Sequence, residues 1–251
     1  MTPTVRPALL LIHGFTGTGA AWADHLPELS RHFDLIAPDL PGHGANPVAA
    51  SVEAAADELA HLVADRRLHV LGYSLGARVA LALAVAHPET VDRLVLESPS
   101  AGIAGSDERA ARRAADDRLA HEIERDGIEA FVERWERKPV FASHAALDPE
   151  VAARQRSIRL AQEPHGLAQS LRLAGQGAMT PLHDRLGEIG RPTLVIVGAL
   201  DPTRPRGEIV ASGIPGARLV VIDGAGHTPH LERPDAFRRH VIDFLLEDAA
   251  A

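Results

Sequence analysis

A serine with a glycine two residues away on either side is the first candidate for chemistry in this sequence. The stretch Gly72-Tyr73-Ser74-Leu75-Gly76 follows a short apolar run and precedes an alanine-rich stretch with helical spacing. In a sharp turn from strand to helix, a serine hydroxyl is presented above the end of the sheet, and the glycines remove side chains that would collide. The pattern therefore predicts that Ser74 is a catalytic serine.

A serine hydroxyl is a weak nucleophile and a weak base at neutral pH unless an imidazole accepts its proton. The imidazole in turn needs a carboxylate that fixes its tautomer and stabilises its charged form. Two later strand ends supply these groups in the order acid, then histidine. Asp201 follows the apolar run 193–197, and His227 follows the run 217–222 and a glycine-rich turn. We therefore predict a triad of Ser74, His227 and Asp201.

Three other polar residues near these loops are weaker candidates. Asp223 and His230 are alternatives to the predicted acid and histidine, but each is placed less naturally at the apex of its loop. His43 belongs to a second loop rich in glycine and proline at a strand end, residues 39–44. We expect His43 to tie loops together rather than to take part in catalysis.

The segment Ile12-His13-Gly14-Phe15-Thr16-Gly17 comes directly after the first apolar run. In folds that carry a serine on a strand-to-helix turn, the oxyanion is held by the amide after the serine and by an amide from an early loop. The sequence therefore predicts an oxyanion hole made by the backbone N–H groups of Phe15 and Leu75.

Short apolar runs alternate with helical stretches in the first hundred residues and again near the end. This alternation is typical of a mostly parallel sheet covered by helices on both faces, and with the serine turn it predicts an α/β-hydrolase fold. We expect strands at residues 8–12, 33–37, 68–71, 94–96, 193–197 and 217–222, and helices at 52–64, 77–86 and 236–246.

The stretch 102–185 has no convincing strand and is expected to form several helices. It carries 12 arginines and Lys138, the only lysine of the chain, against 14 acidic residues. We therefore divide the chain into a first core part (1–101), a helical lid (102–185) and a second core part (186–251). A lid would cover the carboxyl edge of the sheet, where open sheets place their sites. The alternative is a second helical layer without a substrate role.

Composition excludes several classes of function. A net charge of −8 and an aromatic content of 4% argue against a surface that binds nucleic acid. The chain has no cysteine, which excludes disulfides and thiolate chemistry. The apolar run 8–12 is too short to span a membrane and is followed by no cleavage pattern of a signal peptide. We therefore expect a cytoplasmic enzyme that is not inserted in a membrane; the oligomeric state is not predicted.

Arginines near the predicted serine indicate the kind of substrate. Arg78 lies one helical turn after Ser74, and its alternative role is a surface ion pair on the helix. Arg109, Arg112 and Arg113 have helical spacing that we expect to place them on one face. Several guanidinium groups suit a small molecule with several carboxylates, whereas the pocket of a lipase would be more apolar.

The sequence resembles the 2-succinyl-6-hydroxy-2,4-cyclohexadiene-1-carboxylate synthases of the menaquinone pathway. The resemblance runs over nearly the whole chain. It includes the loops and turn already described and, more selectively, the arginine after the serine turn. The stretches that carry it are residues 12–17, 39–44, 72–80, 96–103, 109–117, 138–143 after Trp135, and 164–172.

This resemblance implies a lyase that eliminates pyruvate from an enolpyruvyl-bearing cyclohexene, with a triad-activated serine as general base and without a metal or organic cofactor. It also implies residues that bind the substrate: Arg78, Arg112 and Arg159 at its carboxylates, with Tyr73 and Trp135 lining the pocket. Arg156 is the alternative to Arg159. The chain departs from some of these synthases at Glu136, where they have a tyrosine, so this wall of the pocket is the least certain to match.

Two other functions compete with the lyase. A serine hydrolase, either a carboxylesterase or a carbon–carbon bond hydrolase, would use the same triad with Ser74 as nucleophile or as activator of water. A binding protein that kept only the fold is expected to have lost a member of the triad, and this chain keeps a candidate for each position.

Overall fold

The computed structural model describes residues 6–64 and 66–247, and within them six strands form one parallel sheet in the order β2-β1-β3-β4-β5-β6. Residues 1–5, at the start of the segment in which we expected no signal peptide, lie outside the described residues. The strands are β1 (Ala8–Ile12), β2 (Asp34–Ile36), β3 (Leu68–Tyr73), β4 (Val91–Glu97), β5 (Thr193–Gly198) and β6 (Arg218–Ile222).

The central strands are buried along almost their whole length. β5 and the last four residues of β1 are fully buried, whereas β2 and the first residues of β6, at the two edges, are partly exposed. A parallel strand covered on both faces must be apolar on both faces, which is why the central strands are continuous apolar runs. The edge strand β2 is short, and this limits the unpaired backbone that it exposes.

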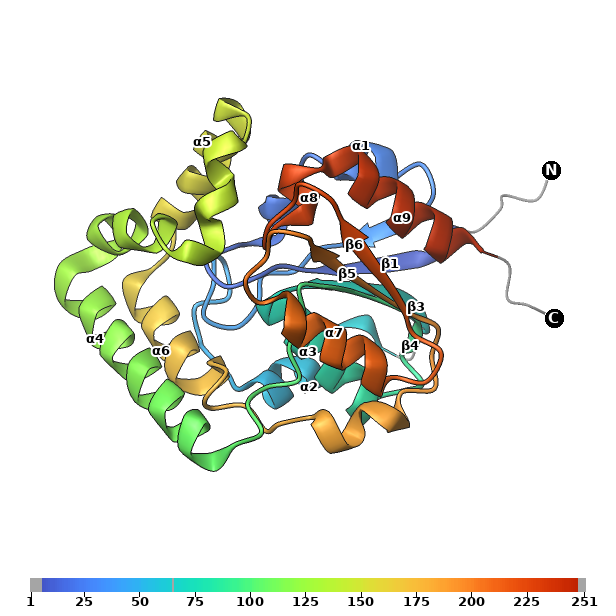
Figure 1. The fold of residues 1–251 in the computed structure, drawn as a ribbon, viewed down its shortest axis with the longest axis horizontal. Coiled ribbons are helices and arrows are strands. Elements are labelled where there is room, and N and C mark those ends of the chain that lie inside the picture. Colours follow the sequence, from blue (N-terminus) through green and yellow to red (C-terminus); the bar gives the residue numbers. More distant parts are fainter. Residues whose placement is uncertain (1–5, 65, 248–251) are drawn as a thin grey trace.

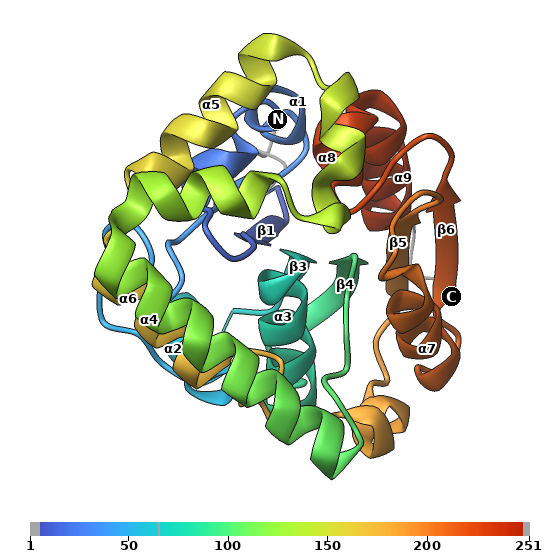
Figure 2. The same cartoon turned by 60° about the vertical axis from the view of Figure 1, so that its left-hand side comes forward.

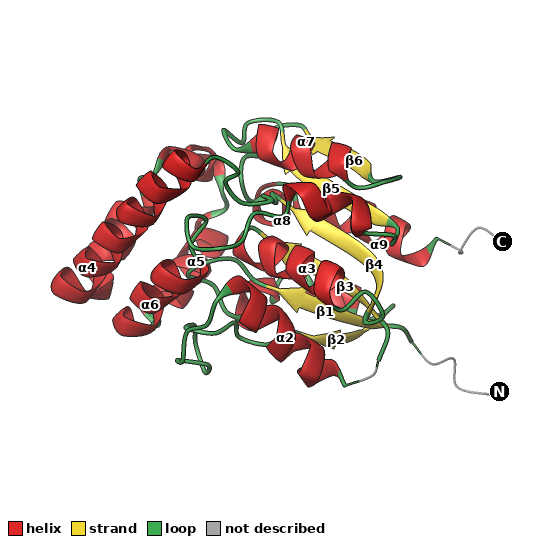
Figure 3. Cartoon of the chain, turned by 90° about the horizontal axis from the view of Figure 1, so that it is seen from below, coloured by secondary structure: helices red, strands yellow, loops and turns green. Residues whose placement is uncertain are grey.

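Helices cover both faces of the sheet (Figure 1). One face packs against α2 (Val52–Val63), α3 (Leu75–Ala86) and α7 (Arg204–Gly213), and the other against α1 (Leu26–Leu29) and α9 (Pro234–Leu246). Figure 3 shows the sheet beneath the first set of helices. The remaining short elements on the core are α8 (Pro229–Glu232) and the 3₁₀ helix η1 (Gly19–Trp22).

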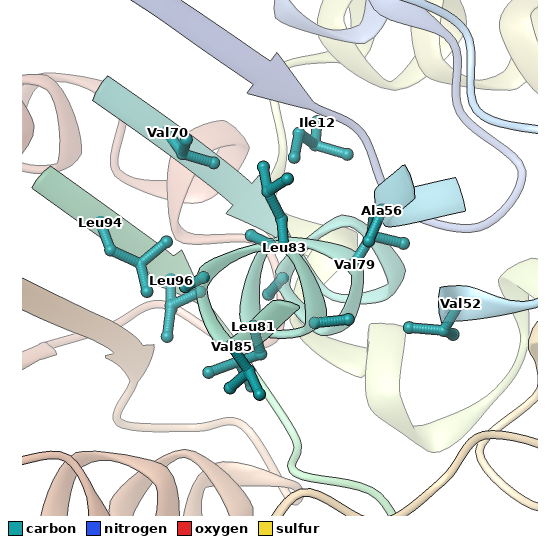
Figure 4. Close-up of a cluster of buried hydrophobic side chains, with 14 of the residues drawn as sticks. Ile12, Val52, Ala56, Val70, Val79, Leu81, Leu83, Val85, Leu94 and Leu96 are labelled. Atoms are coloured by element: carbon teal, nitrogen blue, oxygen red, sulfur yellow. The ribbon is translucent and has the colours of Figure 1, made fainter. Parts of the chain in front are cut away.

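Helix α3 is the most deeply buried helix of the core. All of its residues from Leu75 to Val85 are buried, and its side chains meet those of β1, β3, β4 and α2 (Figure 4). Its alanines let it lie close to the sheet. This packing fixes the start of α3, and therefore fixes the serine turn that precedes it.

Between β4 and β5 the chain forms a separate group of helices, as the sequence predicted for this stretch. They are α4 (Ser106–Glu136), η2 (Pro139–Ala146), α5 (Pro149–Leu160), α6 (Pro164–Ala174) and η3 (His183–Glu188). Helix α4 is kinked at Gly127, whose φ is 81°. α4 packs along α6 through its own apolar cluster, which includes Ile123, Phe131 and Leu167. Figure 2 shows α4, α5 and α6 around the ends of β1 and β3, and Figure 3 shows them beyond the edge of the sheet, whereas η3 packs against α3 and α7 of the core.

The predicted fold class is confirmed, and each expected strand and helix is present with its ends shifted by a few residues at most. Helices α1, α7 and α8 were not predicted from the sequence. Among the described residues, no helix has both the length and the apolar character needed to cross a bilayer. The strand order reverses between β1 and β3, because β2 lies on one side of β1 and β3 on the other. Loops leaving such a reversal diverge and open a crevice for ligands.

Candidate active site

Ser74 lies in the tight turn between β3 and α3, with a backbone conformation that is rare for non-glycine residues (φ 52°, ψ −103°). A Cβ atom on Gly72 would lie 2.4 Å from the Gly76 carbonyl oxygen, and one on Gly76 would lie 2.1 Å from the Ile12 carbonyl oxygen. Both glycines are therefore required by the close approach of backbone. The strained turn costs on the order of 1–3 kcal/mol. It is held by the Ser74 N–H, which donates to the Glu97 carbonyl oxygen at 2.9 Å.

Ser74, His227 and Asp201 come from three different loops and form a chain of hydrogen bonds. His227 Nε2 is 3.1 Å from Ser74 Oγ, and His227 Nδ1 is 2.8 Å from Asp201 Oδ2. When Nδ1 donates to the carboxylate, Nε2 keeps a lone pair that can accept the serine proton. The arrangement is therefore suited to proton transfer from Ser74 to His227.

The Asp201 carboxyl is held in its ionised form. Burial alone would raise its pKa, but hydrogen bonds from His227 and Thr203 outweigh burial and keep the pKa below the ordinary value of 3.8. Thr203 donates to Asp201 Oδ1 through its backbone N–H at 2.7 Å and through its hydroxyl at 2.8 Å. An acid whose side chain accepts from the backbone two residues later is a common turn, so Asp-Pro-Thr after a strand was an available sequence signal for Thr203.

The loop that carries His227 is fixed by two buried groups. Ser98 Oγ donates to the His227 carbonyl oxygen at 2.9 Å. Glu232 accepts from the N–H groups on either side of the histidine, Gly226 at 2.7 Å and Thr228 at 3.0 Å. Burial raises the pKa of Glu232, but these bonds outweigh it and hold the pKa below its usual value. Glu232 was not predicted from the sequence, because an acidic residue gives no sign of its burial before the fold is known.

Phe15 follows β1 and Leu75 is the first residue of α3, and both border the same cavity as Ser74. Within the described part of the chain, neither backbone N–H donates to another residue. The Leu75 N–H also lies at a helix N-terminus, where unsatisfied N–H groups carry partial positive charge. Two such amides can stabilise negative charge that develops on an oxygen beside Ser74.

Side chains from the sheet edge and from the helices between β4 and β5 enclose a cavity of about 500 Å³ next to Ser74 and His227. A cavity of this size can hold a small organic molecule. Its lining is richer in cations than in anions and therefore favours an anionic ligand. The charged residues that line it are Arg78, Arg112, Arg118, Lys138 and Arg206, with the acids Asp116 and Glu122.

Arg78 is the most buried of these cations. Its Nη1 donates to the Ala174 carbonyl oxygen at 2.6 Å, which links α3 to the end of α6. Burial, and then the nearby Arg112, lower its pKa to about 10. The side chain is therefore still charged at neutral pH. Because its partner is a neutral carbonyl, the protein leaves much of this charge for a ligand.

Three more of the predicted binding residues also border the Ser74 cavity. Arg112 donates through Nε to Asp116 Oδ1 at 2.8 Å, and its other guanidinium nitrogens are not engaged by that bond. The Trp135 ring lies 5.3 Å from the Phe15 ring. Tyr73 is partly buried, and loss of solvent raises the pKa of its hydroxyl well above the ordinary value of 10 and keeps it protonated. The structure thus brings Arg78, Arg112, Tyr73 and Trp135 together around Ser74.

The expectation that Arg109, Arg112 and Arg113 share one helix face was wrong. Arg112 borders the Ser74 cavity, whereas Arg109 and Arg113 line a separate surface groove. Arg113 there donates to the Gly177 carbonyl oxygen at 3.2 Å. With 3.6 residues per turn, positions i+3 and i+4 lie on opposite sides of position i, so the side chains diverge.

Arg159 lies outside the Ser74 cavity. It lines a smaller adjoining pocket beside Phe141, and its Nη1 is 3.0 Å from Glu136 Oε1. Arg156, its predicted alternative, is also paired with Glu136 and lines a surface groove that Arg159 and Lys138 border as well. Glu136 thus engages both arginines.

The competing candidates for the triad lie elsewhere. His230 is buried and its Nδ1 is 2.8 Å from Glu97 Oε1, while Asp223 is exposed. The ring of His43 contacts its own loop, with Nδ1 3.1 Å from the Pro41 carbonyl oxygen. None of the three lines the Ser74 cavity. Within residues 6–64 and 66–247, no group of three or more His, Asp or Glu side chains is arranged to hold a metal ion.

Comparison with known proteins places this geometry in a family. The family model described as "alpha/beta hydrolase fold" matches residues 7–234, which contain the serine turn and both of its partners. The chain belongs to the α/β-hydrolase fold family. It is therefore related to enzymes, and the match includes the helices between β4 and β5.

Among members of this family, the chain is similar to a Bacillus subtilis (strain 168) protein provisionally named 2-succinyl-6-hydroxy-2,4-cyclohexadiene-1-carboxylate synthase. The two are 37% identical over 97% of this chain and 92% of that protein. A solved structure titled "Structure of MenH from S. aureus" has a TM-score of 0.93 and 32% identity, covering 97% of this chain and 95% of that one. The resemblance predicted from the sequence is thereby confirmed.

The chain is also similar to an Aeromonas hydrophila pimeloyl-[acyl-carrier protein] methyl ester esterase, which is 32% identical over 95% of each chain. This α/β-hydrolase family therefore includes relatives named for different reactions. The lining of the cavity must decide between those reactions.

Sequence analysis missed three cations of the cavity. Lys138 was noted as the only lysine, but was given no role in the site, and Arg118 and Arg206 were not selected. These residues come from α4, the loop after it and α7. A charged residue in an exposed segment gives no signal of its own, and only the fold brings these three to one cavity.

Proposed function

We propose that this α/β-hydrolase-family enzyme is a lyase that eliminates pyruvate from 2-succinyl-5-enolpyruvyl-6-hydroxy-3-cyclohexene-1-carboxylate and forms 2-succinyl-6-hydroxy-2,4-cyclohexadiene-1-carboxylate. The observation that carries the proposal is the cationic lining of the cavity beside Ser74. The substrate bears carboxylates on its ring, on its succinyl arm and on its enolpyruvyl group. The name of the relative that is 37% identical over 97% of this chain supports the same reaction.

In this proposal Ser74, His227 and Asp201 act as a catalytic triad in which the serine is a base. His227 Nε2, 3.1 Å from Ser74 Oγ, accepts the hydroxyl proton while Oγ takes a proton from a ring carbon of the substrate. Asp201, 2.8 Å from Nδ1, stabilises the imidazolium that results. No acyl-enzyme forms, and the step needs neither a metal nor an organic cofactor.

The electron pair of the broken C–H bond moves toward a carbonyl or carboxylate oxygen of the substrate. The N–H groups of Phe15 and Leu75 are proposed to hold that oxygen. The pair then forms a C2=C3 double bond, the C3=C4 double bond of the substrate shifts to C4=C5, and the C–O bond between C5 and the enolpyruvyl group breaks. The group leaves as an enolate, and the proton held by His227 passes to its carbon, directly or through water, to give pyruvate. Ser74 Oγ already carries the proton from the ring carbon, so loss of the His227 proton restores the triad.

We propose that cationic and aromatic side chains of the cavity bind the substrate. Arg78 and Arg112 would hold carboxylates, and Tyr73 and Trp135 would contact the ring. The segment 102–185 would act as a lid over this cavity, because α4 and α6 supply much of its lining. Arg159 would contribute only if its pairing with Glu136 gave way in the substrate complex.

Release of pyruvate from the enolpyruvyl-cyclohexene substrate tests the proposal, followed through lactate dehydrogenase and NADH. We expect rapid release by the natural protein and a loss on the order of 10³-fold or more in Ser74→Ala. Arg78→Met, which keeps an unbranched stem but removes the guanidinium group, should lose rate as well. Release no faster than the spontaneous background, from folded natural protein, would refute the lyase.

The second candidate is a serine hydrolase, which the same hydrogen-bond chain and the 32% identical methyl ester esterase favour. It would use Ser74 as nucleophile on an ester, or to activate water on a carbon–carbon bond. Fast turnover of p-nitrophenyl esters, stopped by stoichiometric organophosphate labelling of Ser74, would support the hydrolase. Slow ester turnover beside rapid pyruvate release would exclude it as the main activity.

A further inference from the structure

Lys138 occupies an unusual position for the only lysine of the chain. It follows α4, immediately before η2, and borders the same cavity as Ser74. Its Nζ lies 4.7 Å from the centre of the Trp135 ring. A cation over an aromatic ring is attracted to the ring and keeps its charge. The Trp135 ring therefore restrains the position of this ammonium.

The acids near Lys138 in the sequence are already engaged by arginines. Glu133 pairs with Arg137 at 2.6 Å, and Glu136 pairs with Arg156 and Arg159. In the described part of the chain, Lys138 itself forms no ion pair with a carboxylate. A cation at a cavity whose acidic neighbours are committed elsewhere is available to an anionic ligand.

The surroundings of Lys138 show which charges face it. Burial and then Arg112 lower the pKa of the ammonium, whereas Asp116 and Glu122 act in the opposite direction. All of these residues line the Ser74 cavity. Arg112 therefore faces the same space as Lys138, and two cations that repel one another across a cavity are stabilised when a carboxylate lies between them.

Glu136 explains why this role falls to Lys138 and not to Arg159. The resemblance to the synthases pointed to Arg159 as a third cation of the site. Here Glu136 holds Arg159 at 3.0 Å in the adjoining pocket, two residues before the lysine that reaches the cavity. Glu136 thus keeps Arg159 out of the cavity, and Lys138, two residues after Glu136, adds a cation to it.

We propose that Lys138, together with Arg112, binds one carboxylate of the substrate at the Trp135 end of the cavity. The inference rests on the proposed function for the identity of the substrate, and on the cationic lining of the cavity for the ligand class, a small molecule with several carboxylates. It makes Lys138 a residue that determines affinity and specificity, outside the triad that carries out the chemistry.

Binding of benzene-1,3,5-tricarboxylate, measured by titration calorimetry at low ionic strength, tests the ligand class without requiring turnover. We expect Lys138→Gln to weaken binding on the order of tenfold, and Lys138→Arg to restore most of it. Arg137→Gln is the matched control, because it removes one positive charge from the adjacent, exposed residue, outside the cavity. Its effect should stay within about twofold. Equal effects of Lys138→Gln and Arg137→Gln would overturn the inference.

The single lysine allows a direct second readout. Trinitrobenzenesulfonate should modify the ε-amine of Lys138, identified by peptide mass and so distinguished from the α-amino group, and the tricarboxylate should protect it. In the pyruvate assay, Lys138→Gln should raise KM on the order of tenfold with little change in kcat. Tricarboxylate binding that depends on Lys138 in a protein that releases no pyruvate would refute the lyase but not this site. Rapid pyruvate release with an unchanged KM in Lys138→Gln would refute the site but not the lyase.

Discussion

The two walls of the cavity differ in how far the protein itself satisfies their polar groups. On the sheet wall, formed by the loops after β1, β3, β5 and β6, the polar groups are bonded to one another: Asp201 accepts from Thr203 and lies against His227, and Glu232 accepts from the loop around His227. On the helical wall, formed by α4 and the loop after it, Arg112 has one carboxylate partner and Lys138 has an aromatic one.

This difference indicates that one wall is suited to proton transfer and the other to ligand binding. Groups whose hydrogen bonds are satisfied by the protein are fixed in position, which is what a proton transfer over a short distance requires. Cations whose charge is incompletely matched stay available for a ligand. Residues of the sheet wall should therefore control mainly kcat, and residues of the helical wall mainly KM.

The largest expected effect comes from the acid of the sheet wall. Asp201→Asn keeps the shape of the side chain but removes the charge that stabilises the imidazolium and fixes its tautomer. We expect kcat for pyruvate release to fall on the order of 10³-fold or more, with KM little changed. Circular dichroism and the melting temperature serve as the control for folding. A loss that appeared in KM alone would contradict the division between the two walls.

The next effect is on the stability of the protein in acid, and it comes from buried histidines. His13 is neutral beneath the sheet wall: its Nε2 accepts from the Leu40 N–H at 2.8 Å, and its Nδ1 lies 2.8 Å from the Gly14 carbonyl oxygen. Burial lowers its pKa to about 4, and lowers those of His25 and His43 to about 3. Since the unfolded chain takes up these protons near the ordinary value of 6.5, their contribution is complete above that pH and is lost as the pH falls toward 4.

Each buried histidine should therefore lower the free energy of unfolding by up to about 1.4 kcal/mol for every pH unit below 6.5. Urea unfolding at pH 7 and pH 5 measures this. His165→Asn is the comparison, because it removes a histidine whose side chain is exposed and outside the buried set. Equal stability at the two pH values would show that the buried histidines are charged or hydrated in the folded protein.

The smallest effect compares two arginines that each have one carboxylate partner at hydrogen-bond distance. Arg112 pairs with Asp116 beside the Ser74 cavity, and Arg159 pairs with Glu136 in the adjoining pocket. Arg112→Gln should raise KM on the order of tenfold, and Arg159→Gln by less, since the first removes a charge that faces the cavity. Steady-state kinetics on pyruvate release measures both. Equal increases would show that Arg159 leaves Glu136 and reaches the substrate.

The sequence by itself was sufficient for the fold and for the three residues of the hydrogen-bond chain. Central strands buried on both faces have to be apolar runs, so β1, β3 and β5 could be located closely. Ser74, Asp201 and His227 each follow such a strand, and parallel strands bring their carboxyl ends to one edge. Local pattern and chain order were therefore enough to predict that these residues meet.

Only the tertiary structure decided which charged residues reach the cavity. Arg112 and Lys138 border the cavity, whereas Arg113 lines a separate groove. Arg159 is paired with Glu136 and lies outside the cavity. Glu232 likewise became visible as a support of the His227 loop only once it was seen to be buried. Apolar burial repeats with a period that a sequence displays. Whether a charged side chain reaches the cavity is decided by how the helices pack on the sheet, through contacts between segments far apart in the chain that leave no periodic trace.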